Sequence, residues 1–493
     1  MGRLMIRGAD VDGRLVDVSI DGDRIVAVAA ASTPGRRAAP VPTGAVPAGA
    51  DVVEAGGGAL LPGLHDHHIH LLALAAAAGS VPVGPADAGT AEGFPRVLRT
   101  ADRALAPGRW IRAVGYHESV AGPIDRDALD ALVPARPVRI QHRGGAMWVL
   151  NSAGLAEVGL AGRPDGGGAD ASAPDAPAGV ERAADGRITG RLYGLDGWLG
   201  ERVPREPLDL EAVGGMLLRF GVTGVTDATP TERIDDMATL AAAVGDGSLP
   251  QRVVVTGGGG LDPRPGAIEW GPVKLVVADH RLPSVGDLSR AIETAHRQGR
   301  TVALHCVTRV ALLLALAAWD EVGARDGDRI EHGAVVHPEE AVRIARHRLT
   351  VVTQPAFVAE RGDDYLADVE PDDRPYLWRC AGLLEAGIAV GGSTDAPFGP
   401  ADPWRAIAAA VERRTAGGRV LGAGERVSAR RALDLFLGPP EAPGGPSRRV
   451  VAGAPADLCL LTVPLDEALR HPSASLVAAT VRAGRLTRPV RAV

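Results

Sequence analysis

The sequence predicts an α/β protein with three parts: a TIM-like (β/α)8 barrel, an insertion in that barrel, and a small β-sandwich built from both chain ends. Two patterns in the 493-residue chain predict this fold. In the middle of the chain, apolar β-branched segments alternate with helical patterns, which is typical of parallel strands joined by helices. At both ends, short alternating segments are separated by turns, which is typical of antiparallel strands.

The chain ends supply the predicted sandwich. Near the N-terminus, "RLMIRGAD" is followed by "RLVDVSIDGDRIVAVAA", in which Asp21-Gly22-Asp23 supplies a hairpin turn between two alternating segments. The segments "ADLCLLTV" and "LVAATVRAGRLTRPV" near the C-terminus likewise resemble short strands separated by turns. We therefore expect residues 1–57 and 441–493 to build one β domain.

Residues 58–440 are expected to form the barrel. Its later strands are predicted from apolar runs that end in polar residues: "GVTGVTDAT", "RVVVTGG", "VKLVVADH", "TVALHCV", "RIEHGAVV", "LTVVTQP" and "GIAVGGSTDAP". Helices are predicted between them, such as "VGDLSRAIETAHRQG" and "HPEEAVRIARHR", the second with Pro338 in its first turn. The segment from about residue 80 to residue 204 breaks the alternation of strand and helix patterns and is predicted to be an insertion. The acidic run from Glu360 to Pro375 is predicted to be a solvated loop, with a lid over the site as the alternative.

Composition argues against several classes of protein. The net charge of −7, the 3% of aromatic residues and the absence of a basic stripe give a nucleic-acid surface little support. We expect no membrane span, because no apolar run approaches the length of about 20 residues that a bilayer requires. The three cysteines are far apart in the sequence and odd in number, which favours a reducing cytoplasm over a disulfide framework. The many Ala, Gly and Pro residues suggest a bacterial source.

Histidine is concentrated in "LLPGLHDHHIHLLALA", which holds four of the chain's 13 histidines within six residues. Residues two apart on a strand point the same way, so His68 and His70 should project together, with Asp66 one step deeper. Two imidazoles at this spacing can bind one divalent metal, typically zinc. His65 and His67 have the other parity and are expected to face helices or loops, without a metal role. A histidine-rich loop that arises by chance is the alternative.

Four later residues suit the same site. Lys274, His305, His332 and Asp395 lie on or directly after predicted strands, in the order that a barrel would present them around its rim. Each also has a plain structural alternative, such as an ion-paired Lys274 or an Asp395 that caps a helix. By strand parity we expect Glu331 to point away from His332 and to be a structural partner, and Cys306 to face away from the site.

The sequence resembles the amidohydrolase superfamily, in particular its amidohydrolase 3 branch, which includes N-substituted formamide deformylases. "LLPGLHDHHIHL" resembles the family's P-G-hydrophobic-x-D-x-H-x-H motif. "MWVLNSAGLAEVGL", "GRITGRLYG", "GVTGVTDA", "VKLVV", "DRIEHG", "VVTQP" and "GSTDAP" then follow in family order over nearly the whole chain.

The resemblance implies a site of one or two divalent metals, with zinc as the first expectation, held by His68, His70, Lys274, His305, His332 and Asp395. It implies that Lys274 is carboxylated, because an ammonium cannot bind a cation whereas its CO2 adduct offers two anionic oxygens. Asp395 would bind metal and move protons. The implied activity is hydrolysis of a non-peptide carbon–nitrogen bond, of amide or formamide type, in a small molecule by metal-activated hydroxide.

Substrate contacts are less specific. Four residues that the resemblance places near the barrel mouth are candidates for shaping the pocket: His117, Trp148, Asn151 and Gln354. The alternative for each is a local hydrogen-bonding or packing role. Branch members commonly have Asp-Gly after the lysine strand, where this chain has Asp279-His280. The specificity is therefore left open.

Two other functions remain as alternatives. The first is a deaminase that acts on a cyclic or heterocyclic amine, against which the lysine argues because deaminases usually use one metal without a bridging lysine. The second is a non-catalytic scaffold, against which the complete ligand set argues. A homodimer is one option for the assembly.

Overall fold

The computed structural model describes residues 2–31, 50–90, 92–160, 176–230, 233–257, 266–277 and 282–488. The chain divides into two compact units, one of residues 1–72 and 210–493 and the other of residues 73–209. The predicted insertion, at about 80–204, falls within the second unit. The finer division into sandwich and barrel domains stays a prediction.

Parallel strands form the centre of the first unit in two sheets. One sheet has the order β15 (Glu269–Trp270), β14 (Arg252–Val255), β13 (Val222–Asp227) and β6 (Leu64–Ile69). The other has the order β16 (Val273–Val276), β17 (Val302–Cys306), β18 (Arg329–His332), β19 (Thr350–Thr353) and β20 (Val390–Gly392). Each of the seven apolar runs that the sequence predicted as strands contains one of them, so the mixed α/β class with parallel strands is confirmed.

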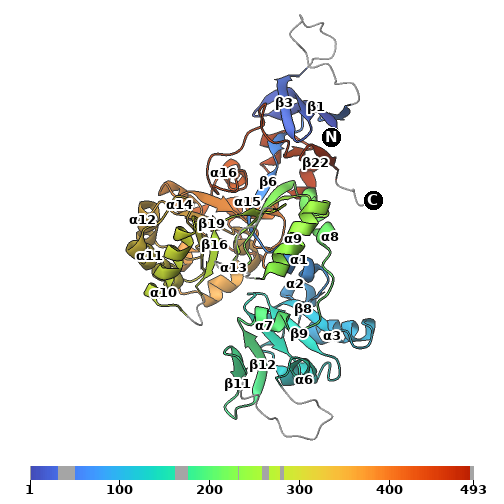
Figure 1. Ribbon diagram of the computed structural model, residues 1–493, viewed down its shortest axis with the longest axis vertical. Coiled ribbons are helices and arrows are strands. Elements are labelled where there is room, and N and C mark those ends of the chain that lie inside the picture. Colours follow the sequence, from blue (N-terminus) through green and yellow to red (C-terminus); the bar gives the residue numbers. More distant parts are fainter. Residues whose placement is uncertain are drawn as a thin grey trace, which may run out of the picture. The chain divides into compact units, whose positions relative to one another are not determined.

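Helices connect these strands, as expected. The two helices predicted above are α10 (Val285–Arg297), capped by Ser284, and α12 (Pro338–Arg346), with Pro338 at its start. Between them, α11 (Arg309–Val322) buries a stripe of Ala and Leu residues and lies beside both neighbours (Figure 1). The other helices of this unit are α8 (Leu210–Arg219), α9 (Ile234–Asp246), α13 (Ala356–Asp368), α14 (Ala381–Glu385), α15 (Pro403–Glu412), α16 (Ala429–Asp434), α17 (Leu465–Ala468) and the 3-10 turns Arg374–Tyr376, Ala423–Glu425 and Ala474–Leu476.

The prediction of a solvated loop from Glu360 to Pro375 was wrong for the first part of this segment. Its first half belongs to helix α13, whose apolar residues Phe357 and Val358 are buried. The acidic residues are stabilised by partners outside the helix: Asp363 accepts hydrogen bonds from Thr415 and Arg419. Charge density alone therefore misled the prediction, because the burial of one apolar face decided the local structure.

Backbone hydrogen bonds join the two parallel sheets at both of their edges. Lys274 N of β16 donates to Gly257 O beyond β14, at 2.9 Å. At the other edge, Asp395 N donates to His68 O, at 2.8 Å. These bonds bring the ends of β6 and β20 together, where several of the predicted ligands lie.

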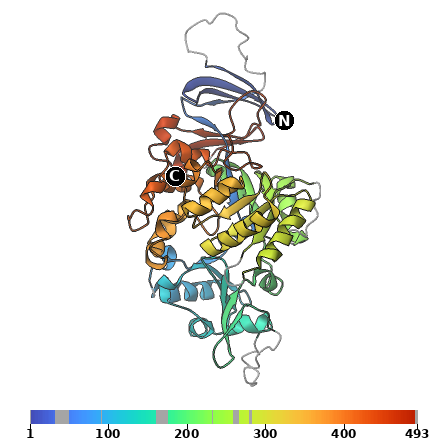
Figure 2. The same ribbon diagram turned by 90° about the vertical axis from the view of Figure 1, so that its left-hand side faces the viewer.

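The chain ends form two further sheets in the first unit. One has the order β3 (Arg24–Ala30), β2 (Arg14–Asp21), β1 (Arg3–Val11) and β4 (Asp51–Glu54), and the other β23 (Arg485–Thr487), β22 (Val477–Arg482), β21 (Leu458–Leu461) and β5 (Leu60–Pro62). They share one hydrophobic core, which includes Ile6, Val18, Leu458 and Val481. Both views show the blue N-terminal strands beside the red C-terminal strands (Figures 1 and 2).

The second unit has a six-stranded mixed sheet in the order β11 (Val180–Arg182), β12 (Ile188–Tyr193), β10 (Met147–Leu150), β9 (Val138–His142), β8 (Ile111–Tyr116) and β7 (Val81–Pro82). Its helices are α2 (Pro85–Ala88), α3 (Gly93–Ala104), α4 (Glu118–Ala121), α5 (Arg126–Asp130), α6 (Ser152–Glu157) and α7 (Asp196–Gly200), and α1 (Leu71–Ala78) begins at the boundary between the units. Among the described residues, no helix has the length and apolar character needed to cross a membrane.

Candidate metal centre

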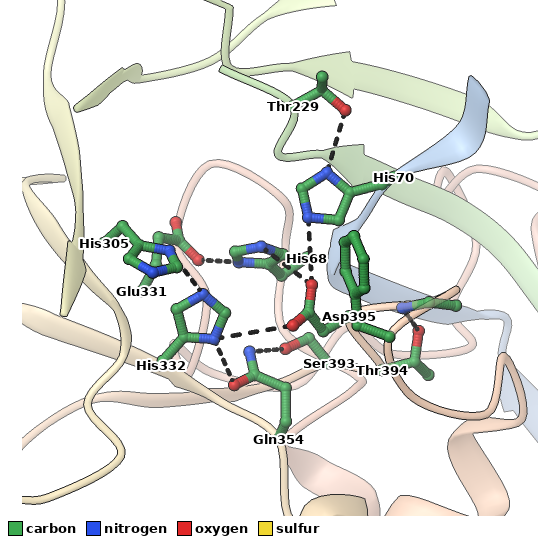
Figure 3. A network of polar contacts seen from close by, with 12 residues as sticks. His68, His70, Thr229, His305, Glu331, His332, Gln354, Ser393, Thr394 and Asp395 are labelled. Carbon is green, nitrogen blue, oxygen red and sulfur yellow. Dashed lines mark hydrogen bonds and ion pairs between the residues drawn. The ribbon is translucent and has the colours of Figure 1, made fainter. Parts of the chain in front are cut away.

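The six predicted ligands come together at the ends of the parallel strands, and Figure 3 shows five of them. His68 lies near the end of β6, and His70 directly follows that strand. Lys274 and His305 lie on β16 and β17, His332 ends β18, and Asp395 follows β20. Residues that are more than 300 positions apart in the sequence thus share one site.

The tightest group is formed by His68, His70 and Asp395. The Nε2 atoms of the two rings lie 3.5 Å and 3.1 Å from the same carboxylate oxygen, Asp395 Oδ1. That oxygen is buried and accepts no hydrogen bond within the described part of the chain. The three side chains can each offer one atom to a common cation.

The other predicted ligands adjoin this group. His305 Nδ1 and His332 Nε2 lie 3.0 Å apart, and His332 Nδ1 is 3.9 Å from Asp395 Oδ2. Lys274 Nζ lies 3.5 Å from His68 Nε2. Nitrogen and oxygen donors of all six residues therefore surround one small region.

Backbone conformation brings the last two ligands into place. His332 has φ +71° and Asp395 has φ +55°, a left-handed conformation that non-glycine residues rarely adopt. At His332 this change ends the regular alternation of strand β18, so both His332 and its neighbour Glu331 reach the site. Glu331 was predicted to point away from His332 and to be a structural partner; it is a partner, of His68 and Arg329, and through His68 it lies at the site.

The pairing register of strands β17 and β18 could have identified Glu331 as a residue of the site. His305 on β17 pairs with Glu331 on β18. Residues paired across parallel strands share a face, so a carboxylate on the face of His305 belongs to the site. Strand parity was applied to His332 instead, whose conformation breaks the rule.

Three of the imidazoles hold a hydrogen-bonding partner at Nδ1. His68 Nδ1 is bonded to Glu331, His70 Nδ1 lies 3.0 Å from Thr229 Oγ1, and His332 Nδ1 lies 2.8 Å from Gln354 Oε1. Such partners fix ring orientation in metal sites. Gln354 was predicted to bind substrate; here its amide nitrogen donates to Ser393 Oγ at 2.8 Å, which aims its oxygen at His332.

Burial controls the charge of these groups. It lowers the pKa of His68 and His332 well below the ordinary value and that of His305 to about 3, so the imidazoles are neutral at neutral pH. Burial also lowers the pKa of Lys274 to about 8, which makes the uncharged amine accessible. Although burial alone would raise it, Arg329 and Lys274 hold the pKa of Glu331 below its usual value.

Asp66 ties the two edge strands together behind the ligands. Its carboxylate accepts hydrogen bonds from Thr394 N at 3.1 Å and His68 N at 3.2 Å, and from the Thr394 hydroxyl. Burial raises the pKa of Asp66 to about 7. Asp66 therefore holds the backbone of His68 and the loop that carries Asp395.

The donor set fits a divalent metal. Neutral imidazole nitrogens and a buried carboxylate oxygen converge, and among the described residues none donates a hydrogen bond to this oxygen. Zinc, iron and manganese accept such ligands. A protonated lysine would not bind a cation, so only a modified or uncharged Lys274 fits as a ligand.

Two remaining histidines of the cluster have no place among the ligands. His65 Nε2 is bonded to Thr226 Oγ1 at 2.9 Å. Both ring nitrogens of His67 are buried without a partner in the described residues. Cys306 Sγ donates to Ala311 O at 3.8 Å, as expected for a side chain that faces away from the site. His280 lies outside the described residues.

The other predicted pocket residues lie in the second unit and have local partners. Asn151 accepts hydrogen bonds from Val138 N and Gly154 N and donates to Val133 O and Arg136 O, so its amide is fully satisfied. Trp148 Nε1 donates to Asp196 at 2.8 Å. Their roles in substrate binding stay predictions.

His117 belongs to a second histidine–carboxylate cluster, with Glu118 and His142. The Nε2 atoms of His142 and His117 lie 3.2 Å and 3.9 Å from Glu118 Oε2. Both Nδ1 atoms accept backbone N–H groups, from Gly144 at 3.0 Å and Ser119 at 3.3 Å. A neutral ring that accepts at Nδ1 carries its proton on Nε2, so these rings point protons at Glu118.

Comparison with known proteins decides the family. A model of the Amidohydrolase family matches residues 51–488. The chain belongs to the Amidohydrolase family. The predicted superfamily and branch are confirmed, and with them an enzyme of the amidohydrolase class.

Two curated relatives and one solved structure illustrate the likeness of this amidohydrolase to others. It is 25% identical to the N-substituted formamide deformylase of Arthrobacter pascens, over 94% of this chain and 93% of the relative. It is 24% identical to the amidohydrolase YtcJ of Bacillus subtilis strain 168, over 73% of this chain and 74% of that relative. An uncharacterized metal-dependent hydrolase from Pyrococcus furiosus has a similar fold, with a TM-score of 0.66, 21% identity, and coverage of 94% and 98%.

Proposed function

We propose that this amidohydrolase cleaves a non-peptide carbon–nitrogen bond of amide or formamide type in a small molecule, with one or two divalent metals as cofactor. The observation that carries the proposal is the convergence of His68 Nε2 and His70 Nε2 on Asp395 Oδ1. The formamide class is suggested by the Arthrobacter relative, which aligns over nearly the full length of both chains.

The proposed ligands are His68, His70, Lys274, His305, His332 and Asp395, with zinc as the preferred ion. We propose that Lys274 is carboxylated to N6-carboxylysine. The lowered pKa of its amine supports this, because only an uncharged amine can add CO2. When bound, such an ion acidifies water and polarises a carbonyl group.

Residues of the chain itself would transfer the protons and hold the cofactor. Asp395 would accept the proton of the attacking water and deliver it to the departing amine. Support for this role comes from Asp395 Oδ1, a buried oxygen that accepts no hydrogen bond within the described residues. His68, His70, His305 and His332 would hold the cofactor, and burial, which lowers the pKa of His68, His305 and His332, keeps these three rings neutral.

We also propose that the eight strands β6, β13, β14 and β16–β20 close into a (β/α)8 barrel. The backbone hydrogen bonds at the two sheet edges support closure. The shared core of the two terminal sheets supports a β-sandwich of both chain ends.

The test combines metal analysis with a substrate screen. Purified protein is expected to contain about one or two equivalents of zinc or a related ion and to hydrolyse some members of a panel of N-formyl and N-acyl amines. Release of ammonia from a ring substrate instead would favour a deaminase. Protein without stoichiometric metal or activity would contradict the proposal and favour a non-catalytic scaffold.

A further inference from the structure

The partners of the site's histidines differ in charge. His70 and His332 are oriented by neutral groups, the Thr229 hydroxyl and the Gln354 amide. His68 alone among these three is bonded to a carboxylate, that of Glu331 (Figure 3). Both His68 and Glu331 are fully buried, so water does not weaken this contact.

Glu331 is itself held from the other side. Its Oε1 accepts a hydrogen bond from Arg329 Nε at 2.6 Å, while its Oε2 contacts His68. Arg329 and Glu331 lie two residues apart on β18 and therefore share a face, and Arg329 is 1% exposed. The carboxylate cannot rotate away from His68 without leaving a buried arginine unpaired.

This arrangement dictates where the proton of His68 lies. A carboxylate only accepts hydrogen bonds, so His68 Nδ1 must carry the proton and Nε2 must present its lone pair. Nε2 is the nitrogen that faces Asp395 Oδ1 and Lys274 Nζ, at 3.5 Å from each. Thr229 imposes no such choice on His70, because a hydroxyl both donates and accepts.

We propose that Glu331, anchored by Arg329, is a positioning residue that fixes the tautomer and orientation of His68 and strengthens its hold on the metal. This inference rests on the proposed metal site. It implies that Glu331 raises the affinity for metal more than the neutral partners Thr229 and Gln354 do.

The decisive variant is Glu331→Gln. A glutamine has only one acceptor oxygen, so it cannot accept from His68 and from Arg329 on two separate oxygens, as the carboxylate does. Loss of a charged partner of a metal-bound histidine typically weakens metal affinity by about 10- to 100-fold. We expect this loss for Glu331→Gln, and a smaller loss for Thr229→Val, in chelator competition with zinc.

Glu425→Gln is the matched control. Glu425 also forms a buried pair with an arginine, since its Oε1 accepts from Arg379 Nε at 2.7 Å. Its other oxygen accepts backbone N–H groups of Cys380 and Gly382 rather than a ring nitrogen of a proposed ligand. We expect Glu425→Gln to change stability while zinc affinity stays at the wild-type value.

Nitrogen-15 NMR of the metal-free wild-type protein provides a test that needs no variant. We expect His68 in the Nδ1–H tautomer; an Nε2–H tautomer would overturn the inference. Zinc affinity that is equal in Glu331→Gln and wild type would overturn it as well. Wild-type protein that binds no divalent ion would contradict the proposed function itself, whatever the tautomer.

Discussion

Two clusters of histidine and carboxylate in this chain look alike in composition and differ in chemistry. In the first unit, His68 and His70 point Nε2 at Asp395; in the second, His117 and His142 point Nε2 at Glu118. The difference lies on the far side of each ring. His68 Nδ1 faces a carboxylate, whereas His117 and His142 accept backbone N–H groups at Nδ1.

The partner at Nδ1 of each ring decides whether Nε2 offers a lone pair or a proton. A ring that donates from Nδ1 offers a lone pair at Nε2 and can bind a cation. A ring that accepts at Nδ1 offers a proton at Nε2 and can only donate to its carboxylate. Spacing and residue type therefore suggest a metal site, but the second contact of each ring distinguishes a metal site from a hydrogen-bonded cluster.

The largest difference in metal content is expected between variants that lack the histidines of one cluster or of the other. His68→Ala with His70→Ala should abolish bound metal and activity, because two of the ligands are lost. His117→Ala with His142→Ala should leave the metal content at the wild-type value. Elemental analysis of both purified double variants measures this, and metal lost from the second variant would break the distinction.

The next effect concerns the carboxylates. Asp395→Asn removes the proposed proton acceptor and should lower kcat by about 100- to 10,000-fold. Glu118→Gln, the equivalent change in the second cluster, should leave kcat within about twofold of wild type. Steady-state kinetics on a confirmed substrate would show this, and an Asp395→Asn enzyme as fast as wild type would remove the proton-transfer role.

A pH effect tests the burial of the first cluster in the metal-free protein. The pKa of His305 is about 3 in the folded state and about 6.5 when unfolded, so between these values only the unfolded state binds the extra proton. His305 therefore makes the free energy of unfolding fall as pH falls through this window. Asp66, with its raised pKa, has the opposite sign, so the comparison is made between wild type and His305→Asn.

Urea unfolding at several pH values gives the slopes. In the window between about pH 6 and pH 4, the wild-type slope should exceed that of His305→Asn by about 1 kcal/mol per pH unit. Equal slopes would mean that His305 is protonated in the folded protein and is not buried as described.

The smallest effect on function is expected at Asn151. Asn151→Ala leaves four backbone groups, three of them in buried contacts, without their partner and should lower the free energy of unfolding by about 2 kcal/mol or more. Because these contacts are structural, kcat/KM and metal content should not change. A variant of wild-type stability with weaker substrate binding would instead support the predicted pocket role.

Much of the fold and the residues that converge at the candidate site could be predicted from sequence, because strand periodicity is a local property. The apolar runs that end in His305, His332 and Asp395 identify both the strands and the side at which their polar residues gather. The D-x-H-x-H segment likewise marks His68 and His70 by spacing alone.

What could not be predicted depends on long-range contacts and on breaks in regularity. The positive φ of His332 breaks the strand alternation, so parity relative to His332 could not show that Glu331 contacts His68. Thr229 and Gln354 gain their roles only through contacts with distant histidines. The helical half of the acidic segment at Glu360 was missed because the apolar face of this helix is buried by distant residues such as Trp378 and Leu421.

The most direct test of the account is a crystal structure of zinc-loaded protein with anomalous diffraction at the zinc edge. The account predicts a zinc peak at about 2.0–2.2 Å from His68 Nε2, His70 Nε2 and a carboxylate oxygen of Asp395. A peak between His117, Glu118 and His142, or fully loaded protein without a peak at His68 and His70, would contradict it.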